Sequence, residues 1–293
     1  MKTRIAPTPS GYLHLGNVLS FSVTAGLAKR AGIKIVLRID DLDRDRVRTE
    51  YVKDIFDTLN FLEIPWDEGP RNYQEYKEEF SQVHRLELYN AVLEQLREDE
   101  QLFACDCTRT QVNIASSDGI YPGTCECRSL SLDQKEVSWR LHTAENRKLV
   151  VKTMEGPVTS GLPDQMRSFV VKKKDGFPAY QLASLVDDQH FGVDVIVRGK
   201  DLWDSTLAQM YLGALLPGNT FYDNLFHHHV LLTDETNGKL SKSDGATSVQ
   251  SLRKAGKAPA EVFGMIGRML EIAEPVSTYR ELALAVERMG RDD

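Results

Sequence analysis

The sequence lacks the features that would place it in a membrane, outside the cell, or on nucleic acid through bulk charge. Its 293 residues hold no apolar run approaching the ~18 residues that a membrane span requires. The N-terminus has no basic-then-apolar leader. The formal net charge is −7, which argues against a protein that coats nucleic acid. We therefore expect a cytoplasmic protein without a membrane partner, whose contacts with RNA, if it has them, use a local basic patch.

Cysteine is scarce, and the four cysteines are clustered. They form two Cys-x-Cys pairs, Cys105 with Cys107 and Cys125 with Cys127. In a cytosolic chain such a cluster indicates metal binding rather than disulfides. Four thiols on two close loops suit a tetrahedral, structural Zn²⁺, so spacing alone favours ligation by all four. The alternative is that the thiols bind no metal.

The order of predicted elements indicates an α/β protein with an insertion. We predict a strand at 3–8, a helix at 14–31 ended by Gly32, a strand at 33–40, and a helix at 50–62 capped by Thr49. Alternating strands and helices are typical of a parallel sheet. From residue 65 the pattern changes to charged helical sequence over 73–100, then the cysteine segment and short strands.

The α/β pattern resumes near residue 178. It continues with a strand at "VDVIVRG", a helix at 201–216 and an apolar strand at "VLLTD", and residues 247–293 predict two or three helices. In the insertion, Lys172, Lys173 and Lys174 precede Asp-Gly; they favour a solvated hairpin turn over an RNA-binding patch. We therefore predict an α/β domain in two halves, 1–66 and 178–246, an inserted α+β subdomain at 67–177 with its zinc segment at 105–127, and a helical C-terminal region at 247–293.

Two loops at strand ends suggest a nucleotide site. In "PTPSGYLHLGN" a helix begins near His14, and its free N–H groups and dipole favour a phosphate. Gly16 lets backbone approach a ligand without Cβ interference. Far along the chain, "KLSKS" places Lys239 and Lys242 in a polar loop after an apolar strand. Taken singly, the first fits an ordinary turn and the second a solvated loop. Together they suit a triphosphate held from both sides, where fixed donors and lysine charge stabilise transfer at the α-phosphate.

These loops resemble the HIGH and KMSKS motifs of class I aminoacyl-tRNA synthetases. The wider stretches "RIAPTPSGYLHLGN", "LRIDDLDRDR", "WDEGP", "PAYQLASLVDD", "VIVRGKDLWDST" and "KLSKS" are similar to the glutamyl branch of that family and run from Arg4 to Ser243. Asn17, which closes "HLGN", departs from the HIGH consensus. The resemblance implies a Rossmann-like, parallel-sheet catalytic domain.

The length of the chain indicates which group within the glutamyl branch it resembles. The chain ends at Asp293, fifty residues after Ser243, where a glutamyl-tRNA synthetase would continue into an anticodon-binding domain. This truncated architecture resembles the group of glutamyl-queuosine tRNA(Asp) synthetases. Membership implies activation of glutamate with ATP, accompanied by Mg²⁺, and transfer of glutamate to the queuosine base in the anticodon loop of tRNA(Asp). We expect a monomer, because nothing in the sequence demands a larger assembly.

The resemblance also implies roles for particular residues. The catalytic set is His14, Lys239, Ser241 and Lys242; the ATP-binding set is His14, Gly16 and Lys242; the glutamate-binding set is Arg4, Ile5, Ala6, Pro7, Thr8, Asp40, Tyr180 and Arg198; and the metal set is Cys105, Cys107, Tyr121 and Cys125, with Cys127 as an alternative fourth ligand. An arginine can hold a carboxylate in a bidentate fork, and an aspartate can accept an ammonium group. Taken singly, these charged residues fit surface ion pairs equally well.

Asp40 departs from the family pattern, which has Glu at this position. Asp is one methylene shorter, so the ammonium group of the substrate would lie about 1.5 Å deeper or be bridged by water. This departure keeps open a synthetase fragment that uses another amino acid or acceptor. A non-catalytic RNA-binding relative is the third alternative. His227–His229 can bring at most two rings to one face of a strand, so we interpret them as structural or nucleotide-adjacent rather than metal-binding.

Overall fold

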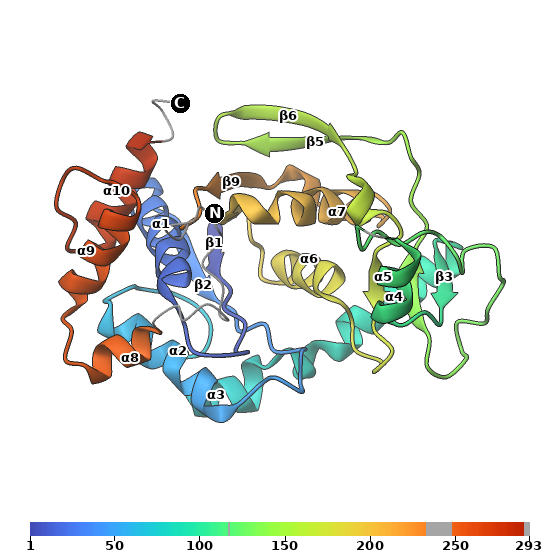
Figure 1. The fold of residues 1–293 in the computed structure, drawn as a ribbon, viewed down its shortest axis with the longest axis horizontal. Helices are drawn as coiled ribbons and strands as arrows, with labels where there is room; N and C mark the ends of the chain where they lie inside the picture. The colour runs from blue at the N-terminus through green and yellow to red at the C-terminus, as the bar shows by residue number, and fades with distance from the viewer. Residues whose placement is uncertain (117, 233–247, 290–293) are drawn as a thin grey trace. The chain divides into compact units, whose positions relative to one another are not determined.

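The computed structural model describes residues 1–116, 118–232 and 248–289. The chain divides into two compact units (Figure 1). The first comprises Met1–His84, Val193–Asp201 and His227–Asp293, and the second comprises Arg85–Gly192 and Leu202–Phe226. No helix in the described ranges has the length and apolar character needed to cross a membrane.

Parallel strands and helices alternate at the start of the first unit. The elements are β1 (Lys2–Ile5), α1 (Leu15–Ala31), β2 (Lys34–Leu37) and α2 (Thr49–Phe61). β1 and β2 pair in parallel, from Lys2 opposite Lys34 to Ile5 opposite Leu37. Gly32 ends α1 at φ 64°, as predicted. The expected cap of α2 was wrong, because Arg48 occupies the cap position and Thr49 is the first helical residue.

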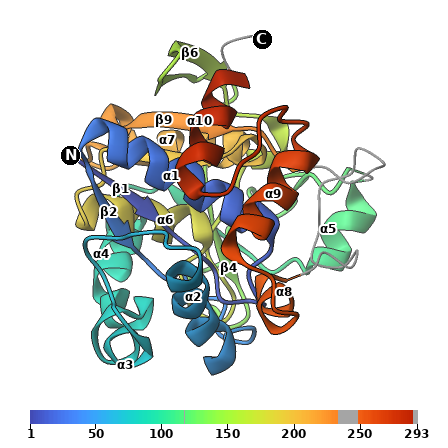
Figure 2. The same ribbon diagram turned by 90° about the vertical axis from the view of Figure 1, so that its left-hand side faces the viewer.

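Three C-terminal helices complete this unit: α8 (Val249–Lys254), α9 (Pro259–Met269) and α10 (Tyr279–Met289). α10 packs along α1 (Figure 2). The contact is close at Gly26, where an added Cβ would lie 2.2 Å from the Cβ of Ala283. Val262 and Ile266 of α9 are buried, so the apolar stripe of this helix packs against the protein.

A buried carboxylate breaks the helix expected over residues 73–100. The chain instead forms α3 (Tyr73–Glu75), a π-helical turn (Tyr76–Phe80), a 3₁₀ turn (Gln82–Arg85) and α4 (Leu86–Glu98). Asp41 accepts hydrogen bonds from the Tyr76 hydroxyl at 2.6 Å, the Ser81 hydroxyl at 2.5 Å and the Gln82 amide at 2.9 Å. Since Asp41 is fully buried, it needs these donors, and a continuous helix would not present all of them.

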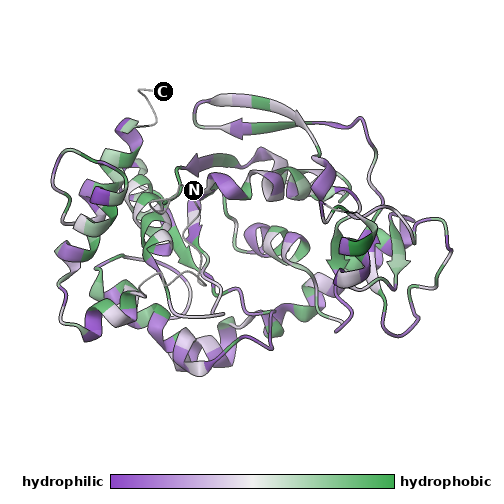
Figure 3. Cartoon of the chain, in the orientation of Figure 1, coloured by the Kyte–Doolittle hydropathy of each residue, from purple (hydrophilic) through white to green (hydrophobic). Residues whose placement is uncertain are grey.

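One further strand and the last three residues of another belong to this unit. β8 (Val195–Gly199) runs beside β1, because the Asp194 amide donates to the Lys2 carbonyl and the Arg4 guanidinium to that of Val197. β9 (Leu225–His229) neighbours β8. The strand predicted at "VLLTD" was therefore misplaced: the strand is the preceding "LFHHH", whose end is hydrophilic (Figure 3).

The second unit holds a three-stranded antiparallel sheet, a hairpin and helices. Its elements are α4, β3 (Leu102–Cys105), α5 (Arg109–Ala115), β4 (Ser138–Leu141), β5 (Lys148–Thr153), β6 (Gly156–Gly161), β7 (Val170–Lys172), α6 (Tyr180–His190) and α7 (Trp203–Gly213), with 3₁₀ turns at Asp164–Met166 and Phe221–Asp223. The sheet order is β3-β4-β7, and β5 and β6 form the hairpin. Arg85 forms a buried ion pair with Asp187, which joins α4 to α6.

The two compact units follow different boundaries from the domains expected above. α6 and α7 group with the expected insertion, and the C-terminal helices group with the N-terminal strands. Compactness reports which residues pack together, whereas the expected division followed the order of elements along the chain. The division into a two-part catalytic domain and an insertion therefore stays a prediction.

Gly69 offers a test of the close contact between its backbone and β2. The segment before it pairs with β2, since Leu37 donates its amide to the Glu68 carbonyl at 2.9 Å. Gly69 has φ 95°, and an added Cβ would lie 2.2 Å from the Leu37 carbonyl oxygen. We predict that Gly69→Ala lowers the free energy of unfolding by more than about 3 kcal/mol in urea denaturation.

Gly256 is the matched control for this substitution. It also has positive φ, 75°, but nothing lies within 4 Å of an added Cβ. Gly256→Ala should cost only the backbone term of about 1–2 kcal/mol. Equal losses in the two variants would contradict a steric role for the contact between Gly69 and β2.

Candidate active site and metal-ligand cluster

The carboxyl ends of β1 and β2 lie side by side in the first unit. Their parallel hydrogen-bond ladder continues beyond the strands, with the Arg38 amide donating to Ile5 and the Asp40 amide to Pro7, both at 2.9 Å. The carboxyl edge of a parallel sheet is where ligands bind in α/β proteins. The predicted turn from Ile5 to Thr8 lies at this edge, with Ile5 and Pro7 buried and Thr8 exposed.

The two predicted arginines also meet there. Arg4, on β1, is buried and donates to the Val197 carbonyl of β8 at 3.0 Å. Arg198, the next residue of β8, is buried as well. The charges of both guanidinium groups act on the ring of His228 in β9. β1, β8 and β9 thus bring two cations and an imidazole to one place.

Asp40 is held by a neighbour that the sequence analysis missed. Arg38 donates through Nε to one carboxylate oxygen at 2.7 Å and through a terminal nitrogen to the other at 3.1 Å. Arg38 is 2% exposed and Asp40 8%. This bidentate pair fixes the plane of the carboxylate. The clue was in the sequence, since residues two apart in an extended segment share a face.

His14 caps α1 in a way that orients its ring. Its Nδ1 accepts from the Gly16 amide at 3.1 Å, while its own amide donates to Oδ1 of Asn17 at 3.0 Å. Because Nδ1 is an acceptor, a neutral ring carries its proton on Nε2 and can donate from there. An added Cβ on Gly16 would lie 3.0 Å from Cε1 of His14, so the glycine leaves room for the ring. Asn17, the departure from the HIGH consensus, completes the capping box.

The predicted lysine motif lies outside the described residues. Lys239, Ser241 and Lys242 fall between 233 and 247. The described chain resumes at Ser248, which forms a β-bridge with His14, and the Val249 amide donates to the Leu13 carbonyl at 2.8 Å. The chain that follows the motif therefore lies beside the cap of α1.

The histidines of β9 differ in burial, since His229 is buried whereas His227 and His228 are partly exposed. His229 is buried, and burial lowers its pKa to about 4. Burial, followed by the charge of Arg198, lowers the pKa of His228 to about 3. Both rings are therefore neutral near pH 7. His228 is a site residue whose role the sequence analysis did not assign.

Tyr180 belongs to the second unit, where it is the first residue of α6 and is 43% exposed. Its role in amino-acid binding stays a prediction. In the same unit each lysine of the predicted hairpin contacts another residue. Lys172 lies over the Trp139 ring, Lys173 pairs with Asp175, and Lys174 donates to the Asp106 carbonyl. The bridge between Lys172 and Pro178 confirms the hairpin turn.

Three of the four cysteines converge. The Sγ atoms of Cys105, Cys107 and Cys125 all lie within 4.8 Å of one another. A tetrahedral zinc with Zn–S bonds of about 2.3 Å places its sulfurs about 3.8 Å apart, so this geometry fits the ion. Cys127 is exposed and is not in this group. The side chain of Tyr121 packs against the cluster, and its hydroxyl accepts from the Cys125 amide at 2.8 Å.

The surroundings of the cluster shift the pKa values of its members in opposite directions. Burial raises the pKa of the Cys105 thiol, but hydrogen bonds from Arg140 and Tyr121 outweigh it and bring the pKa to about 7. Burial and the neighbouring thiols raise the pKa of Cys107 to about 12. Burial also raises the pKa of the Tyr121 hydroxyl. Full ionisation of these groups therefore requires a cation among them.

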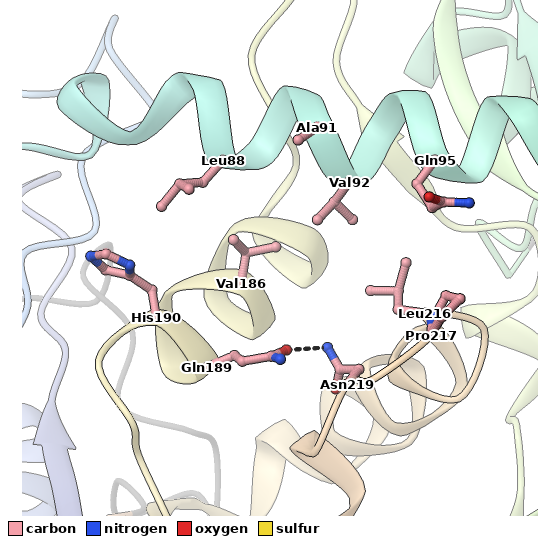
Figure 4. A pocket seen from close by; sticks show the side chains of 10 residues that line it. All are labelled: Leu88, Ala91, Val92, Gln95, Val186, Gln189, His190, Leu216, Pro217 and Asn219. Carbon is pink, nitrogen blue, oxygen red and sulfur yellow. Dashed lines mark hydrogen bonds between the residues drawn. The ribbon is translucent and has the colours of Figure 1, made fainter.

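A cavity of about 440 Å³ lies elsewhere in the second unit (Figure 4). It is lined by α4, α6 and the segment after α7, with Gln189 hydrogen-bonded to Asn219 at its wall. None of the residues predicted for catalysis, substrate binding or metal binding lines it.

The chain is similar to a family of known enzymes. Residues 1–274 match the family described as "tRNA synthetases class I (E and Q), catalytic domain". A protein of Symbiobacterium thermophilum named Glutamyl-Q tRNA(Asp) synthetase is 34% identical over 93% of this chain and 88% of its own length. One of the same name from Nitratidesulfovibrio vulgaris is 32% identical over 92% of this chain and 86% of its own.

A solved structure shows the fold. The glutamate tRNA ligase of Elizabethkingia meningosepticum, crystallised with its amino acid, superimposes with a TM-score of 0.73 at 20% identity. The match covers 97% of this chain but 64% of that one, so the chain spans just under two thirds of the ligase. The chain therefore has the class I synthetase catalytic fold, an α/β fold with a parallel sheet, as predicted.

The partly buried ring of His228 makes stability depend on pH. The pKa is about 3 in the folded protein and about 6.5 in an unfolded chain, so the folded state binds fewer protons between these values. Stability from this residue is fully present above pH 6.5 and is lost as the pH falls toward 3. We predict that His228→Gln reduces the slope of unfolding free energy against pH, measured by urea denaturation between pH 7 and 4.5. A slope equal to that of the wild type would contradict the assignment.

Proposed function

The chain belongs to the family of class I tRNA synthetases for glutamate and glutamine, and is thus a ligase; on that premise we propose that it activates glutamate with ATP and transfers it to the queuosine base of tRNA(Asp). The observation that carries this proposal is the cap of α1. There the His14 ring, the helix N-terminus and the chain that follows the lysine motif come together. A helix N-terminus with an imidazole donor suits a triphosphate.

The edge residues of the parallel strands suit the amino acid. The guanidinium groups of Arg4 and Arg198 can bind a carboxylate. Asp40, fixed by Arg38, offers negative charge for the ammonium group. The neutral ring of His228 adds a polar wall without adding positive charge beside the arginines. Tyr180 adds a phenol in this proposal.

The reaction needs positioning and charge stabilisation rather than a protein nucleophile. A carboxylate oxygen of glutamate attacks the α-phosphorus, forming the mixed anhydride while the bond to pyrophosphate breaks. Negative charge grows on the phosphoryl oxygens and the leaving group. The N-terminus of α1, Nε2–H of His14 and the ammonium groups of Lys239 and Lys242 would stabilise it, with Mg²⁺ accompanying ATP.

The acceptor is proposed from the names of the relatives. Proteins named Glutamyl-Q tRNA(Asp) synthetase match most of this chain and most of their own length. Transfer to another acceptor or use of another amino acid remains the alternative, because Asp40 replaces the longer Glu of the family pattern.

ATP–pyrophosphate exchange tests the activation step. We expect exchange with glutamate, little with aspartate or glutamine, and a loss on the order of a hundredfold or more in Lys242→Ala, because the ammonium charge acts on the transition state. Asp40→Glu should retain exchange with glutamate. No exchange with any of the three amino acids, with or without tRNA, would contradict the proposed activation.

The acceptor is tested with labelled glutamate and two preparations of tRNA(Asp), with and without queuosine. Label should appear only on the queuosine-bearing tRNA, and removal of the 3′ terminal adenosine before the reaction should not prevent labelling. Equal labelling of both preparations would show a different acceptor.

We propose that the cysteine cluster holds one structural Zn²⁺ through Cys105, Cys107 and Cys125. Tyr121 is the proposed fourth ligand, because its hydroxyl lies against the cluster whereas Cys127 is exposed. Cys127 is the alternative. The ion would stabilise the loops that follow β3, since thiolates of neighbouring segments would then share one cation.

Metal analysis and three variants test the site. We expect about one zinc per chain by mass spectrometry. Cys125→Ser should lose the metal and, with it, thermal stability. Tyr121→Phe should bind zinc at least about tenfold more weakly, while Cys127→Ser binds as the wild type does. If Cys127→Ser binds zinc more weakly and Tyr121→Phe binds it as the wild type does, Cys127 is the fourth ligand. One zinc per chain in Cys125→Ser would exclude the proposed ligand set.

A further inference from the structure

Asp54 is a buried carboxylate outside every motif discussed above. It lies on α2 in the first unit and is 2% exposed. Two side chains donate to it: the guanidinium of Arg253 on α8 and the Thr58 hydroxyl at 3.4 Å. The backbone amide of Leu13 also acts on it and lowers its pKa against the effect of burial. Arg253 and Leu13 belong to segments far from α2 along the chain.

Those two segments meet at the cap of α1. Leu13 immediately precedes His14, and its carbonyl accepts from the Val249 amide at 2.8 Å. Its amide acts on the Asp54 carboxylate and lowers the pKa of that group. Leu13 therefore interacts with both α2 and α8. Ser248 bridges His14 itself.

The energetics favour a positional role for this pair over a stabilising one. Burial raises the pKa of Asp54 and Arg253 opposes the shift, so the carboxylate carries a desolvation cost that the ion pair offsets. Buried ion pairs are weak contributors to stability, yet removing one partner leaves an uncompensated charge. An apolar pair would join α2 to α8 as well, but it would place no charge beside the Leu13 amide.

We propose that Asp54 is a positioning residue that acts through His14. Its carboxylate anchors α8 through Arg253. The start of α8 in turn holds the Leu13 carbonyl and bridges His14, so the ion pair fixes the backbone from which the His14 imidazole is aimed. The consequence for catalysis rests on the proposed function, whereas the consequence for the His14 ring does not.

The chain supplies matched variants. Asp54→Asn keeps an oxygen for the Leu13 amide but loses the charge facing Arg253, and Asp54→Ala loses both. Arg253→Lys keeps the charge on α8. The control is Asp57→Asn, since Asp57 is 63% exposed and its carboxylate lies 3.8 Å from the same guanidinium.

The first measurement needs no activity. Ring ¹³C–¹H correlation spectra report the seven histidines of the chain, and the His14 signal is identified by its loss in His14→Gln. We expect the His14 ring signal to shift in Asp54→Asn and further in Asp54→Ala, and to stay in place in Asp57→Asn. Circular dichroism checks that each variant is folded, and Arg253→Lys replaces any Asp54 variant that is not.

The second measurement is ATP–pyrophosphate exchange. Because a misplacement of about 1 Å can cost about a hundredfold, we expect kcat/KM for ATP to fall by about that factor in Asp54→Ala. The KM for glutamate should change less than twofold. Arg253→Lys should lie between Asp54→Ala and the wild type.

An unmoved His14 signal in folded Asp54→Ala overturns the proposal, as does an equal effect of Asp57→Asn. Equal changes in the kinetics of ATP and glutamate would also overturn it, because they would indicate a general loss of structure. If the wild type shows no exchange with glutamate, the proposed function fails, and the ring spectra still decide the role of Asp54.

Discussion

The capping of α1 by His14 is the interaction on which the candidate site depends. Its Nδ1 accepts the Gly16 amide, which places the proton of a neutral ring on Nε2. Asn17 closes the reciprocal bond, and Gly16 leaves space for the ring. The helix dipole then adds to the imidazole at the same point. A residue that did not cap the helix would leave both the ring and the first turn without a fixed orientation.

Three buried carboxylates of the first unit each hold a different segment in place. Asp40 faces Arg38, Asp41 gathers donors from the chain after α3, and Asp54 joins α2 to α8 and to the cap. Burying a charge is costly unless it is paired, so each carboxylate is stable in one arrangement of donors. Such pairs add little to the free energy of unfolding, but they define positions. Asp40 and Asp41 do so just after β2, and Asp54 does so on α2.

The metal cluster follows the same principle in the second unit. Cys105 is ionised more easily than a free thiol, because Arg140 and Tyr121 donate to it, while burial opposes the ionisation of Cys107 and Tyr121. The cluster is thus arranged for a cation whose charge would ionise the remaining ligands. Spacing in the sequence favoured four cysteines, and only the packing of the Tyr121 side chain against the sulfurs distinguished it from the exposed Cys127.

The sequence by itself determined the parts that depend on local order: the strand–helix–strand start, the Gly32 stop, the cap at His14 and the resemblance to class I synthetases. Local propensity and motif spacing carry that information along the chain. The tertiary structure decided what depends on distant partners. The long helix after residue 73 breaks because Asp41 draws its donors there, the last strand is "LFHHH" because it lies beside β8, and Arg38, His228 and Asp54 acquire roles only through neighbours on other elements. The partner of a buried charge is set by the packing of distant segments, and the periodicity of the sequence does not indicate it.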